Sequence, residues 1–140
     1  MRGEVFAIAA AILWGLVPVI DKIALSSGVS IYTANVIRSI GAATTIITLS
    51  VLTSQLQTTV DLKTVACLLV GGAIAGAFAV ILYFSAIKTI GASRTVPITA
   101  AYPMFTAIIS ILVLGESISL KVAVGIVLIV IGIILVSEIQ

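Results

Sequence analysis

The chain has 140 residues, of which 61% are hydrophobic and 9% are charged. Soluble domains carry about 25% charged residues, so this composition excludes an ordinary water-soluble fold. The chain has no histidine and one cysteine, which excludes an intrachain disulfide and leaves almost no ligands for a zinc or redox centre. We therefore expect no metal, no cofactor and no nucleic-acid partner.

Five stretches are apolar enough and long enough to cross a bilayer, which takes about 20 helical residues. We predict spans at residues 5–25, 31–52, 64–87, 95–114 and 120–136, with charged residues almost entirely between them. The sequence thus predicts an all-α integral membrane protein of the cell membrane, with residues 1–140 in one domain. An odd number of spans puts the two ends on opposite sides, so the chain looks like one half of a larger assembly, such as one built from an inverted repeat.

The first predicted span places Trp14, Pro18 and Asp21 on one face, at spacings of four and three. If this face points inward, Asp21 could pair with Arg38, or couple transport to a proton or a sodium ion. The alternative, which we favour, is that Asp21 and Lys22 are two interfacial charges at the end of a helix.

Arg38 is the most costly residue of the second span, because only 14 residues, Ser39 to Leu52, follow it before the span ends. A central arginine costs about 2.5 to 3.5 kcal/mol on insertion scales, although snorkelling lowers the cost. Arg38 therefore either binds an anionic group or a carboxylate, or extends its side chain to the interface. Asn35, Ala42 and Thr45 share its face, which favours an inward arginine.

The third and fifth spans carry small residues at regular spacings, which allow helices to approach closely. Gly72, Gly76 and Tyr83 share one face of the third span, and Gly125 and Gly132 lie seven residues apart in the fifth. We expect the glycines to serve helix packing, with one of the two faces as a possible dimer contact. Tyr83 could face a cavity or anchor the helix at the membrane interface.

The fourth span has five polar residues aligned along one face. Such a stripe either lines a cavity, which we favour, or joins helices through hydrogen bonds. Pro97 and Pro103 remove backbone donors from the same span, so we expect a kink near the middle of the membrane. The aligned residues are Thr95, Thr99, Tyr102, Thr106 and Ser110.

The distribution of lysine and arginine does not predict which way the chain crosses the membrane. Cytoplasmic loops usually carry an excess of these residues, but the two sides of the predicted topology carry almost equal numbers of them. The chain could therefore insert in both orientations, or in one orientation that other factors decide. Two oppositely inserted copies would form an inverted repeat.

The segment GASRTVPITAAYPMFTAIISILVLGESISLKVAVGIVLIVIGIILV, residues 91–136, resembles the end of a repeat of the drug/metabolite transporter superfamily, EamA-like branch. The segment ILWGLVPVIDKIAL is similar to the first helix of that family, and Arg38 matches an arginine often found early in its second helix. Most members have two five-helix repeats in opposite orientations. The resemblance covers essentially the whole chain, which is similar to the superfamily's five-helix members.

The resemblance implies a homodimer, or a heterodimer with a similar small chain, around a cavity lined by helices one, three and four of each copy. Glu116 matches the glutamate of the family's Gly-Glu pair. It could gate or anchor the loop between the fourth and fifth spans. The alternative, which we prefer, is that its negative charge stabilises the start of the fifth helix through the helix dipole. The chain lacks the mid-membrane glutamate of the four-helix small multidrug exporters, which puts their proton-exchange mechanism in doubt here.

We therefore predict a secondary transporter of a small metabolite or amphipathic compound, and not an enzyme, working by alternating access in a two-chain assembly. The alternative is a non-transporting scaffold or regulatory subunit of a membrane partner. The residues expected to face the substrate path are Trp14, Arg38, Tyr83, Thr99, Tyr102, Pro103 and Thr106.

Overall fold

The structure is a computed structural model that describes residues 2–57 and 59–138. All regular elements of this part of the chain are helices. Five of its helical segments are long and apolar enough to cross a membrane, which confirms the predicted membrane class. These segments are Gly3–Ser26, Ile31–Leu52, Leu62–Ile90, Ala92–Leu114 and Leu120–Ser137.

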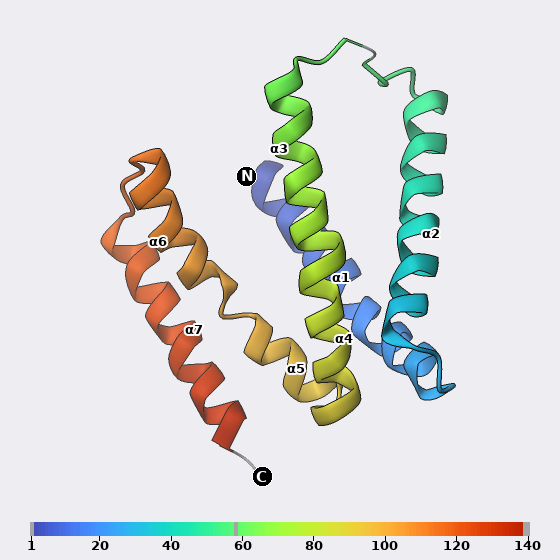
Figure 1. Cartoon of the computed structure of the whole chain (residues 1–140). Helices are drawn as coiled ribbons and strands as arrows, with labels where there is room; N and C mark the ends of the chain where they lie inside the picture. The colour runs from blue at the N-terminus through green and yellow to red at the C-terminus, as the bar shows by residue number, and fades with distance from the viewer. Residues whose placement is uncertain (1, 58, 139–140) are drawn as a thin grey trace. The chain divides into compact units, whose positions relative to one another are not determined.

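The five spans contain eight elements, because the third and fourth spans are subdivided (Figure 1). The third span consists of two α-helices joined by a π-helical segment, and the fourth consists of two shorter helices. The elements are α1 (Arg2–Ser26), α2 (Ile31–Leu52), α3 (Leu62–Gly72), η1 (Ala73–Phe78), α4 (Ala79–Ile90), α5 (Ala92–Thr99), α6 (Tyr102–Leu114) and α7 (Leu120–Glu138).

The helix ends follow local capping rather than hydropathy alone. Helix α2 has the predicted bounds, whereas the third span begins two residues before the predicted Thr64 and continues to Ile90. The carboxylate of Asp61 accepts hydrogen bonds from the N–H and hydroxyl of Thr64, so the helix begins at Leu62. At the other end, Gly91 has a φ of 79°, a conformation that favours glycine and separates α4 from α5.

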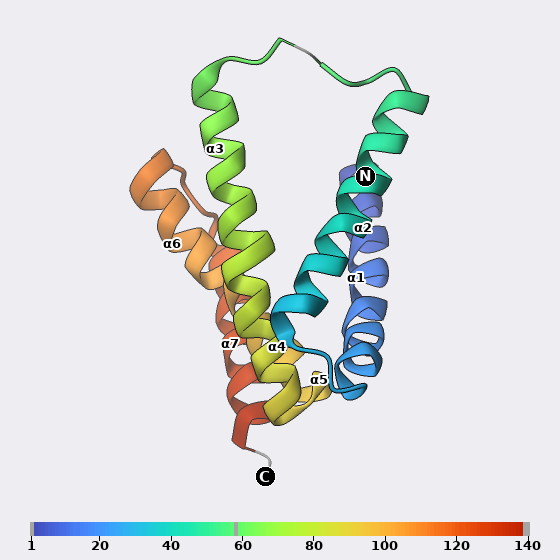
Figure 2. The same cartoon turned by 45° about the vertical axis from the view of Figure 1, so that its right-hand side comes forward.

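The chain divides into two compact units, the first ending at Lys88 and the second beginning at Thr89. In the first unit, α2 and the α3–η1–α4 segment diverge towards the loop that joins them and converge away from it (Figure 2). A small core lies at the converging end, where Leu25, Phe84 and Ile87 are buried. Partly buried residues pack around it, namely Val29, Ile31, Ala34, Val80 and Tyr83.

Two lysines connect the elements that meet at the converging end of the first unit. The Lys22 ammonium donates to the carbonyl oxygen of Ile87 at 3.4 Å, near the C-terminus of α4. The Lys88 ammonium donates to the carbonyl oxygen of Val29 at 2.7 Å, in the loop between α1 and α2. Cations are favourable at helix C-termini, where carbonyl groups have no partner within the helix. The two bonds therefore join α1 to α4, and α4 to the loop.

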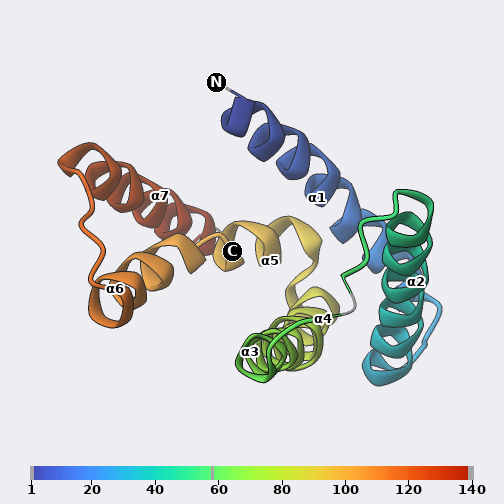
Figure 3. The same cartoon turned by 90° about the horizontal axis from the view of Figure 1, so that it is seen from above.

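The second unit consists of α5, α6 and α7, with α7 running back beside the other two (Figures 1 and 3). The Arg94 guanidinium in α5 donates to the carbonyl oxygen of Ser137 near the end of α7 at 3.0 Å. Two alanines, Ala100 and Ala101, separate α5 from α6, so the predicted kink is a full interruption of the helix. Pro103 lies in the first turn of α6, where its missing N–H removes no bond that the new helix needs.

Candidate functional site

The strongest concentration of buried polar groups lies at the converging end of the first unit. Arg38 lies on α2, seven residues after the start of the helix, and faces α1. Its Nη1 lies 3.9 Å from Oδ2 of Asp21. The Asp21 side chain is 11% exposed and that of Arg38 is 40% exposed. The structure therefore places Asp21 beside Arg38, whereas the expectation favoured from the sequence is that Asp21 and Lys22 form two interfacial charges at a helix end.

An aromatic ring forms a third side of this site. The Arg38 guanidinium carbon lies 5.7 Å from the centroid of the Phe84 ring, within the range of a cation–π interaction. Phe84 is 1% exposed, so its ring is fixed by the core around it. Phe84 thus limits where the flexible arginine side chain can lie.

The ion pair is not closed by a hydrogen bond. Charge-assisted bonds between nitrogen and oxygen are about 2.7–2.9 Å long, shorter than the 3.9 Å found here. Oδ2 of Asp21 is buried and accepts no hydrogen bond from the described residues. Asp21 and Arg38 therefore attract each other across a gap, and a modest movement can separate them.

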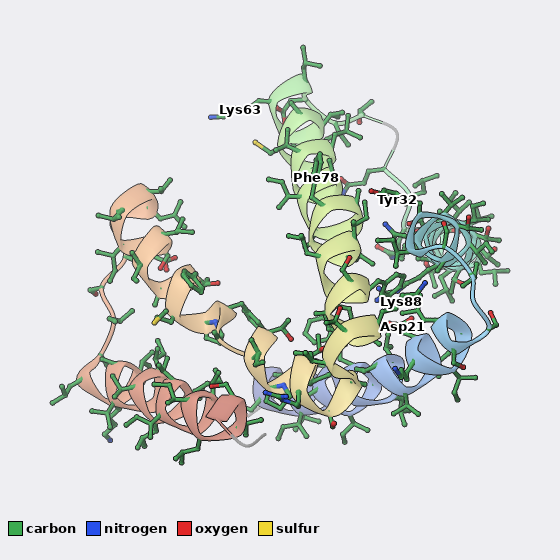
Figure 4. The ribbon with its side chains drawn as sticks, turned by 60° about the horizontal axis from the view of Figure 1, so that its bottom comes forward. Asp21, Tyr32, Lys63, Phe78 and Lys88 are labelled. Carbon is green, nitrogen blue, oxygen red and sulfur yellow. The ribbon has the colours of Figure 1, made fainter. Side chains whose placement is uncertain are left out.

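Cations outnumber carboxylates at this end. Lys22, Arg38 and Lys88 lie here with Asp21, whereas Lys63 lies at the far end of α3 (Figure 4). Figure 4 shows Asp21 and Lys88 in the region where α1, α2 and α4 meet. Although adjacent in sequence, Asp21 and Lys22 point to different partners, since Lys22 bonds to α4. The site therefore has an excess of positive charge next to one buried carboxylate.

Two cavities adjoin Arg38. The larger, about 420 Å³, is mainly apolar, and Asp21, Arg38 and Phe84 are among its lining residues. The smaller, about 270 Å³, lies between α2 and the η1–α4 segment. Its lining residues are Asn35, Arg38, Ser39, Ala42, Ala75, Gly76 and Val80. Small-molecule sites typically measure about 300–1,000 Å³, so the larger cavity lies within this range and the smaller one just below it.

Asn35 fixes the wall of the smaller cavity. Its buried amide donates to the carbonyl oxygen of Gly76 at 2.9 Å. Gly76 belongs to the π-helical segment η1, at whose end the N–H of Ala79 bonds five residues back to Ile74. Such segments are rare and occur often at functional sites. The bond explains how α2 is held against η1 in the apolar interior.

Other residues that the sequence predicts for the substrate path are distributed over both units. Tyr83 is half-buried beside Phe84, with ring centroids 6.3 Å apart. Trp14 is 68% exposed and lines neither cavity at Arg38. In the second unit Thr99, Tyr102 and Thr106 are exposed and Pro103 is half-buried. The hydroxyl of Thr99 bonds to carbonyl groups of its own helix.

The four predicted packing glycines have open space where a side chain would lie, although the carbonyl oxygen of Gly76 accepts a hydrogen bond from Asn35. A Cβ atom added at Gly72, Gly76, Gly125 or Gly132 would meet nothing within 4 Å. Glu116 continues the turn that Gly115 begins, and its backbone N–H donates to the carbonyl oxygen of Ser110. The Gly-Glu pair thus forms the end of α6.

Sequence reasoning missed Phe84, and it noted Asn35 only as a neighbour of Arg38. Val80, Phe84 and Ile87 follow helical spacing, so their common face is visible in the sequence. However, α4 is apolar on nearly every side, and no polar face indicates which apolar face is buried.

Comparison with known proteins agrees with this architecture. The profile of the EamA-like transporter family matches residues 1–138. An "Uncharacterized transporter" of Clostridium kluyveri (strain ATCC 8527 / DSM 555 / NBRC 12016 / NCIMB 10680 / K1) is 33% identical over 134 residues. The match covers 93% of this chain and 42% of that relative, so the chain spans less than half of the relative's length. No solved structure matches significantly. With five membrane spans and a family profile that covers almost the whole chain, this protein belongs to the EamA-like transporter family.

Proposed function

We propose that the chain is one half of a secondary transporter that carries a small metabolite or amphipathic compound across the cell membrane by alternating access. Family membership and the relative's description as a transporter support transport in general. The proposal for this chain is carried by one observation, the open Asp21–Arg38 pair beside a cavity of about 420 Å³.

The physical argument concerns the cost of charge in a membrane. Ionisable side chains within membrane spans are expensive and usually mark a substrate or ion pathway. A pair that served stability alone would gain most from direct hydrogen bonds, yet Oδ2 of Asp21 has none from the described residues. An open pair next to a cavity supports a role in binding, with Arg38 attracting an anionic group and Asp21 as a candidate for coupling to a proton or a sodium ion.

We further propose that transport takes place in a pair of five-helix units, formed with a second copy or a similar small chain in antiparallel or paired arrangement. The open space at Gly72, Gly125 and Gly132 supports this, because helices of another unit could approach there, whereas Gly76 lines the smaller cavity. In such a pair, exposed residues of the single chain can face the substrate path. Trp14, Tyr83, Thr99, Tyr102, Pro103 and Thr106 are the candidates, and Glu116 is the candidate for the loop between α6 and α7.

The experiment compares the metabolites inside and outside cells that express the wild-type chain, Arg38→Ala or Lys63→Ala. Lys63 is the matched control, since it is a cation of the same unit at the opposite end of α3 (Figure 4). Transport predicts that some compound changes its distribution with wild type and Lys63→Ala, and that Arg38→Ala abolishes the change. The compound found is then measured in proteoliposomes containing the purified chain.

A scaffold predicts a different result. No compound would be redistributed by any of the three chains, although each would be present in the membrane at a similar level. Loss of transport in both variants would instead remove the specific role of Arg38.

A further inference from the structure

Arg38 lies between two cavities of different electrostatic character. It lines both the larger cavity and the smaller one. The larger cavity contains the Asp21 carboxylate, which repels an anion. No acidic side chain is among the described residues that line the smaller cavity. An anion is therefore better placed on the Asn35 side of Arg38 than on the Asp21 side.

The smaller cavity also offers hydrogen-bond donors and a short apolar wall. Arg38, which lines both cavities, has five N–H donors in a planar fork that matches a carboxylate, and Ser39 adds a hydroxyl. Ala42, Ala75 and Val80 form the apolar part of the lining. At about 270 Å³, the cavity suits a small organic acid with a compact apolar body rather than a large drug-like compound.

Two attractive groups determine where the Arg38 guanidinium lies. The guanidinium lies 3.9 Å from Asp21 and 5.7 Å from the Phe84 ring centroid, so two attractive groups hold it on the larger-cavity side. Since the pair has no direct hydrogen bond, a ligand carboxylate that accepts two bonds from Arg38 can compete with Asp21.

We propose that the smaller cavity, lined by Asn35, Arg38 and Ser39, binds the carboxylate of a small apolar monocarboxylic acid, and that Asp21 is an internal carboxylate that competes with this ligand for Arg38. The inference names a substrate class for the transport function proposed above and rests on it. The solute carboxylate replaces Asp21 as the partner of Arg38, and no covalent bond changes.

Benzoate is the probe, and benzamide is its neutral control with the same ring. Binding is measured by equilibrium dialysis of the radiolabelled compounds against the purified full chain in phosphatidylcholine nanodiscs. Because a charge-assisted bond is about twice as strong as a neutral one, benzoate is expected to bind at least about tenfold more tightly than benzamide. Equal binding of the two compounds, or no binding of benzoate, overturns the proposal.

Two variants are expected to act in opposite directions. Asp21→Asn removes the competing charge and is expected to tighten benzoate binding about threefold, with benzamide unchanged. Ser39→Asp puts a carboxylate at the smaller cavity and is expected to weaken benzoate binding at least about tenfold. Ser39 is exposed and bonds to no other element in the described structure, so this variant tests the site even if Asp21→Asn does not fold.

Ser50→Asp is the matched control, since Ser50 is on α2 and lines neither cavity. It is expected to bind benzoate like wild type, and a loss equal to that of Ser39→Asp overturns the subsite. If the folded Asp21→Asn variant binds benzoate more weakly than wild type, Asp21 does not compete with the ligand for Arg38. Phosphatidylglycerol added to the nanodiscs tests whether a lipid phosphate is the ligand. Unchanged benzoate binding supports a soluble acid as the ligand, and displacement of benzoate by the lipid overturns the proposal.

Measuring benzoate uptake by proteoliposomes tests the transport function separately from binding at the smaller cavity. Binding with the expected pattern but no benzoate uptake by proteoliposomes leaves the subsite in place and contradicts transport of this acid. Uptake that Ser39→Asp does not reduce supports transport and overturns the subsite.

Discussion

The guanidinium of Arg38 and the carboxylate of Asp21 lie 3.9 Å apart within the membrane spans, close enough to attract and too far apart to share a hydrogen bond. The two residues come from adjacent helices joined by a loop of four residues, Ser27 to Ser30. Such a pair is weak evidence for stability, because desolvation offsets much of its attraction. Its significance lies in how easily one partner can be replaced by a ligand.

A double-mutant cycle tests this relationship. Asp21→Leu alone and Arg38→Met alone each leave one charge without its partner, so each is expected to lower the free energy of unfolding by about 1 kcal/mol or more. The double variant is expected to be more stable than either single variant, because no unpaired charge remains. Unfolding in mixed detergent micelles measures all four chains. Strictly additive effects would contradict a coupling between the two side chains.

Phe84 is expected to be the most important apolar side chain of the first unit. It is 1% exposed, and Phe84→Ala would leave a cavity beside Leu25 and Ile87. We expect a loss of about 3 kcal/mol in unfolding free energy, at the lower end of the range for buried phenylalanines in water, because helices in lipid associate through packing. Phe78→Ala is the control, since Phe78 is 68% exposed in the same span (Figure 4). Equal losses in both variants would contradict the core described here.

Asn35 is expected to hold α2 against the π-helical segment through its bond to Gly76. Asn35→Leu keeps the approximate size of the side chain and removes the donor. Interhelical hydrogen bonds in membranes contribute about 0.6 kcal/mol on average, and up to about 2 kcal/mol, so a loss in this range is expected. Thr45→Val provides the control, because the Thr45 hydroxyl bonds within its own helix to Gly41. Hydrogen exchange should become faster in residues 73–78 for Asn35→Leu only.

The membrane spans could be predicted because the bilayer imposes a length and a composition on every crossing helix. A kink in the fourth span could also be predicted, since Pro97 and Pro103 remove backbone donors, but not that it would be a full interruption at Ala100 and Ala101. The exact helix ends could not, because they depend on single capping groups. Asp61 and Gly91 lengthen the third span beyond its most apolar stretch.

The site could be predicted only in part. Arg38 and Asp21 are conspicuous because charges are costly within spans, yet the sequence does not show whether their faces meet. The role of Gly76 was not predictable from helical spacing, because the π-helical segment changes the register of the helix there. The sequence predicts that Gly76 serves packing through its missing side chain, whereas its carbonyl oxygen makes the contact with α2.

Gly115 ends α6 in the left-handed conformation, with φ 67° and ψ 22°. The backbone N–H groups of Gly115 and Glu116 both bond to the carbonyl oxygen of Ser110, a typical way to end a helix. Gly115→Ala is expected to cost about 1 kcal/mol through backbone strain, since an added Cβ would meet no atom within 4 Å. Glu116→Gln keeps the same backbone bond and is expected to change thermal stability little. A larger loss for Glu116→Gln than for Gly115→Ala would assign the main role to the glutamate side chain.

Asp61 is expected to make the start of α3 sensitive to acid. Hydrogen bonds from the hydroxyl and N–H of Thr64 hold the pKa of the Asp61 carboxyl below its ordinary value. A lowered pKa in the folded state means that the stabilisation is complete above the unfolded pKa, about 4, and is lost as the pH falls through the folded value. Asp61→Asn keeps the capping oxygen but cannot ionise, so its cap does not change over this range.

The measurement is hydrogen exchange at Thr64 and Val65 in wild type and Asp61→Asn, from neutral pH down to about pH 3. After correction for the intrinsic pH dependence of exchange, protection in the wild type should fall below about pH 4, and protection in the variant should stay level. The difference between the two chains isolates Asp61 from the other carboxylates, which titrate in both. If both chains lost protection at the same pH, the acid sensitivity would belong to another group, and the charge of Asp61 would contribute nothing to the start of α3.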